Sequence, residues 1–165
     1  MAEAITPTLV ITGGKKLIGI KQIMSLSNNL TGELWKRFMQ KQTTLLHPVS
    51  ANRFSLQVYP TNYFELFDPS TTFEKWALVE VADFEDTQKG FEQFTLPSGL
   101  YAVFHYKGLS TDPSIFQYIF SEWLPQSEYV LDNRPHFEVL GKLYRNNHPE
   151  SEEDIWIPIK PLIKP

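Results

Sequence analysis

Apolar and polar residues alternate along several short stretches of the chain, which is the pattern of β-strands. The clearest stretch is 54–59, where Phe54, Leu56 and Val58 alternate with other residues, so that this strand has two different faces. Glycine, proline and Asn-Asn breaks separate the stretches from one another. Strands are therefore predicted over 8–12, 16–25, 54–59, 76–81, 91–106, 135–144 and 154–160.

Two other stretches have apolar residues at helical spacing. The first predicted helix covers 32–46, with Thr31 as its N-cap and Pro48 just beyond its end. The second covers 112–123 and is expected to stop at the Trp-Leu-Pro sequence that begins at Trp123.

The order strand, helix, strand, strand occurs twice, at nearly constant separation along the chain. Phe54 corresponds to Phe137 and Trp76 to Trp156, although the two halves share little sequence. We interpret this as one domain, residues 1–165, made of two βαββ repeats at about 8–86 and 87–165. The expected fold class is α+β, with pseudo-twofold symmetry, antiparallel sheets and helices on one face. The opposite face is expected to form a central ligand groove.

Composition narrows the possible functions. The net charge of −4 and the absence of a Lys/Arg cluster argue against direct nucleic-acid binding. With no cysteine, disulfides and thiol catalysis are excluded, and the four dispersed histidines do not predict a metal site. No signal peptide or membrane-spanning run is recognisable, so a soluble, cytoplasmic protein is expected. With 12 Phe, 7 Tyr and 4 Trp, some rings are expected to line a cavity.

Four sequence segments together resemble a known family. They are Leu-Pro-x-Gly-x-Tyr-Ala-Val-Phe at 96–104, Trp-Leu-Pro-x-Ser at 123–127, Arg-Pro-x-Phe-Glu-Val at 134–139 and Ile-Trp-Ile-Pro-Ile-Lys at 155–160. In order and spacing they resemble the GyrI-like small-molecule-binding family. That family also supplies the effector-binding domains of multidrug-responsive transcription regulators of the AraC and MerR types.

The resemblance implies a tandem βαββ fold with an aromatic cleft and a pocket glutamate that meets cationic, planar, hydrophobic compounds. Glu138 stands where that glutamate is expected, and Trp156 holds a position often occupied by an aromatic residue. Residues 1–15 are too few for the helix-turn-helix of the regulators, so the chain is expected not to read DNA by itself.

The candidate ligand-binding residues follow from strand alternation and from the repeat. Glu138 and Leu140 are expected to face the groove if Phe137 and Val139 meet the helices, with solvent exposure of Glu138 as the alternative. The expected ligand-binding set is Glu138, Trp156, Trp76, Tyr59, Gln57, Leu140, Trp123 and Tyr106.

Each of the other candidates has its own reason. Gln57 and Tyr59 map through the repeat onto the face of Glu138. Trp76 and Trp156 would form an aromatic slot for a flat ligand, or else belong to the core. Trp123 is expected either to contact the ligand or to pack at the end of its helix. Tyr106 and Tyr101 are on opposite faces of one strand, and Tyr106 is preferred as the residue that faces the groove.

Three functions follow from this picture. The first is stand-alone binding of small hydrophobic, cationic or planar molecules, for sensing or sequestration, without cofactor or catalytic residues. The second is hydrolysis of reactive cyclopropane-containing compounds, with Glu138 as general base beside Tyr59 or Trp123. The third is a protein-interaction role such as topoisomerase inhibition. No membrane partner is expected, and the chain is expected to be a monomer or homodimer.

Overall fold

The computed structural model describes residues 5–41, 47–85 and 87–163. Its strands are β1 (Thr8–Thr12), β2 (Lys15–Met24), β3 (Arg53–Val58), β4 (Phe73–Val81), β5 (Glu92–Leu96), β6 (Gly99–Lys107), β7 (Tyr129–Leu131), β8 (His136–Leu140) and β9 (Glu152–Pro161). The helices are α1 (Thr31–Gln40), α2 (Ser114–Tyr118), the π-helical turn η2 (Ile119–Trp123) and α3 (Leu124–Gln126). All strand pairs are antiparallel, and the predicted α+β, tandem βαββ fold is confirmed.

The strand order is symmetric about its centre. It runs β1-β6-β9-β8-β3-β4-β2-β5, with β7 attached to β9. The two βαββ units therefore meet at the centre of the sheet, where β3 of the first unit pairs with β8 of the second.

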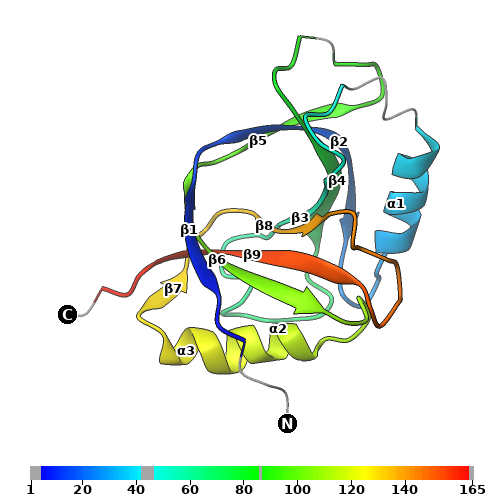
Figure 1. The fold of residues 1–165 in the computed structure, drawn as a ribbon. Coiled ribbons are helices and arrows are strands. Elements are labelled where there is room, and N and C mark those ends of the chain that lie inside the picture. Colours follow the sequence, from blue (N-terminus) through cyan, green and yellow to red (C-terminus); the bar gives the residue numbers. More distant parts are fainter. Residues whose placement is uncertain (1–4, 42–46, 86, 164–165) are drawn as a thin grey trace.

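The two ends of this order belong to one long antiparallel ribbon. β1 pairs with β6, β2 pairs with β5, and the register is the same on both sides of the breaks at 13–14 and 97–98. The predicted strand 91–106 is thus two strands, because Pro97 cannot donate to a ladder. The ribbon exchanges strands between the repeats and closes the sheet into a ring (Figure 1). An aromatic core fills the inside of this ring.

The two faces of the sheet have different partners. One face encloses the aromatic core: Leu17, Phe54, Leu56, Trp76, Leu78, Leu96, Tyr101 and Phe137 are buried there. On the other face, α1 packs through Leu34 and Phe38 on β2 and β4. The α2–η2 segment packs through Ile115 and Ile119 on β6 and β9. The two helical segments therefore cover the outer parts of the sheet and leave β3 and β8 between them (Figure 1).

Both predicted helices differ from the sequence prediction at their ends. Thr31 is the first residue of α1 rather than its N-cap, and the side chain of Asn29 accepts a 3.0 Å hydrogen bond from its N–H. The rest of the predicted helix falls partly on 42–46, outside the described residues. The second helix does not stop before Pro125 but continues through it into α3. In a regular α-helix the ring of Pro125 would clash with the carbonyl of the residue four positions earlier. The π-helical turn that precedes Pro125 is wider than an α-helical turn and makes room for this ring.

Candidate functional site

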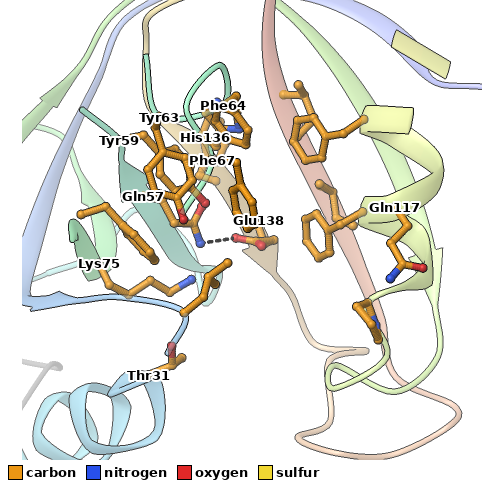
Figure 2. Close-up of a pocket in the computed structure, with 18 of the residues that line it drawn as sticks. Thr31, Gln57, Tyr59, Tyr63, Phe64, Phe67, Lys75, Gln117, His136 and Glu138 are labelled. Carbon is orange, nitrogen blue, oxygen red and sulfur yellow. Dashed lines mark hydrogen bonds between the residues drawn. The ribbon is translucent and has the colours of Figure 1, made fainter. Parts of the chain in front are cut away.

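A groove of about 700 Å³ lies between α1 and α2, above the central strands β3 and β8 (Figure 2). It is on the side of the sheet that carries the helices. The expectation that the groove lies on the opposite face is wrong, because closure of the sheet fills that face with the aromatic core. The two helices instead form the opposing walls, and Thr31 and Gln117 mark them in Figure 2.

Aromatic rings form the upper part of the groove. The segment after β3 contributes Tyr59, Tyr63, Phe64 and Phe67. The ring of Phe64 stacks on His136, with centroids 5.2 Å apart, and on Phe120, with centroids 5.0 Å apart. Phe64 therefore links the loop after β3 to η2 and closes this end of the groove. The lining residues are Met24, Leu26, Asn29, Thr31, Gln57, Tyr59, Tyr63, Phe64, Phe67, Phe73, Lys75, Pro113, Phe116, Gln117, Phe120, Ser121, His136, Phe137, Glu138, Ile155, Trp156 and Ile157.

The floor of the groove carries a small polar group. Gln57 donates from Nε2 to Oε2 of Glu138 over 3.1 Å, and Figure 2 shows both side chains and Lys75 pointing into the same space. Strand register explains the arrangement, because Gln57 pairs with Lys75 on one side and with His136 on the other. The floor thus combines a carboxylate, a carboxamide and an amine within an aromatic surround.

The remaining titratable groups near the floor are held neutral. Burial, together with the charge of Arg134, lowers the pKa of His136 to about 3. Burial raises the pKa of Tyr59, and the nearby Glu138 carboxylate adds to this. At neutral pH the imidazole and the phenol are both uncharged, so neither His136 nor Tyr59 adds a charge to the lining.

Glu153 lies near the groove on β9. Burial and repulsion by Glu138 raise its pKa from 4.5 to about 7, Lys75 opposes the shift, and Asp154 adds to it. The folded protein therefore holds this proton more tightly than the unfolded chain, in which the usual pKa applies. The stabilisation is fully present below pH 4.5 and is lost as pH rises towards about 7.

Glu153→Gln is expected to remove this pH dependence, because glutamine resembles the protonated acid at every pH. At pH 8 the variant should exceed the wild type in free energy of unfolding by about 1–3 kcal/mol, and at pH 4.5 the two should converge. Denaturant unfolding at the two pH values measures this, with exposed Glu122→Gln as control. If Glu153→Gln and the wild type differed in free energy of unfolding by the same amount at pH 8 and at pH 4.5, the raised pKa of Glu153 would be contradicted.

Four of the sequence-predicted site residues come together. Glu138, Gln57, Tyr59 and Trp156 all line the groove. The sequence predicts that Phe137 and Val139 meet the helices if Glu138 faces the groove. They face the aromatic core instead, and Glu138 faces the side of the sheet that carries both the helices and the groove.

The two predicted slot tryptophans lie on the core face of the sheet, and only Trp156 reaches the groove lining. Trp76 packs in the aromatic core and is absent from the lining. Trp156 contributes to the lining, but its ring stacks on Phe137 in that core with centroids 5.2 Å apart. The reason is strand alternation, since Trp156 follows Ile155, the residue that pairs with Glu138 on the groove face.

The other three predicted residues also lie elsewhere. Trp123 packs edge-on against Phe104 and borders a separate small pocket. Tyr106 is buried with the α2 cluster and donates to the carbonyl of Leu109 over 2.7 Å. Leu140 pairs with Arg53 at the end of β8 and does not line the groove.

Sequence reasoning missed Lys75, His136, Phe64, Phe116 and Phe120. For Lys75 the signal in the sequence was only weak, since Glu74 and Glu80 are also charged residues of β4. The aromatic residues gave no such signal, because rings in a loop or on a short helix occur in cores as often as in sites.

The described residues contain neither a metal-binding cluster nor a membrane-spanning helix. Within 5–41, 47–85 and 87–163 no group of three or more His, Cys, Asp or Glu is placed to hold a metal ion. In the same segments no helix is long and apolar enough to cross a membrane.

Comparison with known proteins identifies relatives of this fold. Residues 8–159 match the family model Cass2, described as an integron-associated effector binding protein. No curated protein sequence matches the chain.

Three solved structures are similar to this one. SAV2435 bound to tetraphenylphosphonium has a TM-score of 0.71 at 17% identity and covers 94% of both chains. An integron cassette protein of Vibrio cholerae has a TM-score of 0.65 at 15% identity, over 94% of this chain and 96% of that one. The C-terminal domain of EcmrR has a TM-score of 0.67 at 11% identity, over 96% and 99% of the two chains.

Proposed function

The chain belongs to the Cass2 family of integron-associated effector binding proteins, and we propose that it binds small aromatic, hydrophobic molecules in the groove between α1 and α2. The observation that carries the proposal is the half-buried carboxylate of Glu138 on the floor of an aromatic groove, held by Gln57. The rings would supply most of the affinity, and Glu138 would bind the cationic or hydrogen-bond-donating part of the ligand.

The dimensions and lining support this function. A volume of about 700 Å³ lies within the range of small-molecule sites, which are typically apolar with a few placed polar groups. Phe64, Phe116 and Phe120 are only partly buried, so part of each ring remains exposed for contact with a ligand. The similar structure of SAV2435 holds tetraphenylphosphonium, an aromatic cation.

A preference for cations is supported by the surroundings of Glu138. Among the described residues, Glu138 forms no ion pair within 4.0 Å, and its one side-chain donor is the neutral Gln57. Its charge is therefore not neutralised locally by a direct contact, and a ligand cation would provide that contact. Faces of the surrounding rings would add cation–π attraction of about 0.5–2 kcal/mol for each contact.

The proposed role in the cell is reversible sensing or sequestration of such compounds in the cytoplasm, without direct contact to nucleic acid. The net charge of −4 supports the last point, because nucleic-acid binding requires clustered positive charge.

Glu138→Gln tests the proposal directly. The variant is expected to bind tetraphenylphosphonium about tenfold more weakly than the wild type, which corresponds to about 1.4 kcal/mol of lost attraction. Binding of neutral triphenylphosphine oxide should change much less, because stacking on the rings is retained. Isothermal titration calorimetry measures both affinities, and chromatography of the recovered ligand reports whether it is unchanged.

The matched control is Glu33→Gln, which removes the same charge from the exposed surface of α1. It should bind both compounds as the wild type does. Equal affinity of Glu138→Gln and wild type for the cation would remove Glu138 from the site, and absence of binding of either compound to the wild type would refute the proposed function.

A further inference from the structure

Lys75 is an unusual residue for a strand of this kind. It lies in β4 between neighbours that are buried or half-buried, and only 8% of its surface is exposed. Lysine is almost never so buried unless it is paired. Yet within the described part of the chain its ammonium group forms no hydrogen bond with a side chain and no ion pair within 4.0 Å.

The side chain of Lys75 is directed into the groove. Lys75 is among the lining residues, and Figure 2 shows it extending beneath Gln57 towards the space that Glu138 also faces. The amine is therefore accessible to a molecule in the groove although the residue as a whole is buried.

Strand register explains why Lys75 and Glu138 do not pair with each other. Lys75 is on β4 and Glu138 on β8, and β3 runs between them. Gln57 of β3 is directly opposite Lys75 and donates its amide to Glu138. Gln57 thus takes the place on the carboxylate that a lysine would take in an ion pair.

The two charges are separated by a distance that suits one ligand. Neighbouring strands are about 4.8 Å apart, so the backbones of β4 and β8 are separated by roughly 10 Å across the sheet. The side chains approach each other from these positions. A drug-sized molecule on the groove floor can therefore contact both groups at different points.

An ammonium that is largely desolvated and has no partner among the described residues is costly, so the free protein gains nothing from it. Burial lowers the pKa of Lys75, and the carboxylates of Glu138 and Glu153 act in the opposite direction. In either protonation state the amine remains a hydrogen-bond donor with no acceptor supplied by the described residues.

We propose that Lys75 is a second recognition group, which binds an anionic or hydrogen-bond-accepting group of the ligand. Together with Glu138 it selects amphoteric aromatic molecules, whose donor or cationic end binds Glu138 and whose acceptor or anionic end binds Lys75. This inference rests on the proposed function of the groove and specifies the class of ligand. A groove with Glu138 alone would favour simple cations, whereas the combination favours zwitterions.

Two rhodamine dyes with the same aromatic skeleton separate these cases. One carries a free carboxylate and is a zwitterion at neutral pH; the other is its methyl ester, a monocation. The wild type is expected to bind the zwitterion about tenfold more tightly than the ester, measured by fluorescence anisotropy. Lys75→Met should lose about tenfold in affinity for the zwitterion and little for the ester, so that the preference is abolished or reversed.

Two further variants complete the experiment. Lys36→Met removes the same charge from the exposed surface of α1 and should retain the preference of the wild type. Lys75→Gln keeps a hydrogen-bond donor without the charge and should give an intermediate preference. Both Lys75 variants remove an amine that has no partner among the described residues. Their unfolding temperatures should therefore not fall below that of the wild type, which thermal unfolding checks.

The outcomes distinguish this inference from the function on which it rests. Tighter binding of the ester than of the zwitterion by the wild type, or equal losses for both dyes in Lys75→Met, would overturn the role of Lys75 and leave the proposed function standing. Failure of both dyes to bind the wild type would overturn the two together.

Discussion

Replacing Phe137 by alanine is expected to lower the free energy of unfolding by about 3–5 kcal/mol. Phe137 is 1% exposed and lies at the centre of the aromatic core. Its ring contacts three others: Phe54 at 5.8 Å, Tyr101 at 5.4 Å and Trp156 at 5.2 Å between centroids. Removal of the ring leaves a cavity that large neighbouring rings cannot fill without leaving their own contacts.

Denaturant unfolding followed by tryptophan fluorescence measures this loss. Phe67→Ala is the matched control, because Phe67 is 56% exposed and its truncation leaves no enclosed cavity; a change within about 1 kcal/mol is expected. Similar losses in the two variants would show that the core is not organised around Phe137. A large loss of unfolding free energy in Phe137→Ala but not in Phe67→Ala would show that the fold is stabilised by the core-facing side of β8, opposite Glu138.

Replacing Gly19 by alanine is expected to destabilise the protein by about 3 kcal/mol, the upper part of the range for overpacking. A Cβ atom at Gly19 would overlap the backbone carbonyl of Ala77 on the paired strand β4. A backbone group cannot rotate away as a side chain can, so β2 and β4 would have to separate. That movement would disturb the strand that carries Lys75 into the groove.

Gly32→Ala provides the comparison for Gly19→Ala. Gly32 is in α1, and a Cβ atom there would meet nothing within 4 Å. Alanine should stabilise this position by about 0.4–1 kcal/mol, because it restricts the unfolded chain and favours the helix. Thermal unfolding of both variants should therefore show shifts of opposite sign. A stable Gly19→Ala protein would mean that β2 and β4 approach each other less closely than described.

The position of the groove follows from the symmetry of the two βαββ units. Each unit has one helical segment, and each segment covers the outer strands of its own half. The inner strands β3 and β8 meet at the centre with no helix above them. Their outward side chains, among them Gln57, His136 and Glu138, are therefore the groove floor.

The sequence alone predicted most of the elements in their order and four of the groove residues, but it missed β7 and the division of 91–106 into β5 and β6. Alternation along 54–59 correctly separated Phe54 and Leu56, which are in the core, from Gln57 and Tyr59, which face the groove. Alternation also separated Glu138 from Phe137, whichever face met the helices. These inferences succeeded because the side-chain period of a strand is a local property of the backbone.

The tertiary structure alone decided which face of the sheet is the site. Two faces alternate along every strand, and local sequence does not say which of them meets the helices. Here closure of the ribbon of β1–β2 with β5–β6 buries Trp76 on the inner face and packs the half-buried Trp156 against the same core. The same holds for Lys75 and Phe120, which join Glu138 only through pairing and packing of segments distant in the chain. The sequence determined most of the elements and the alternation of faces along their strands, because these depend on neighbouring residues. The assembly of the groove depended on long-range strand pairing, which local patterns do not encode.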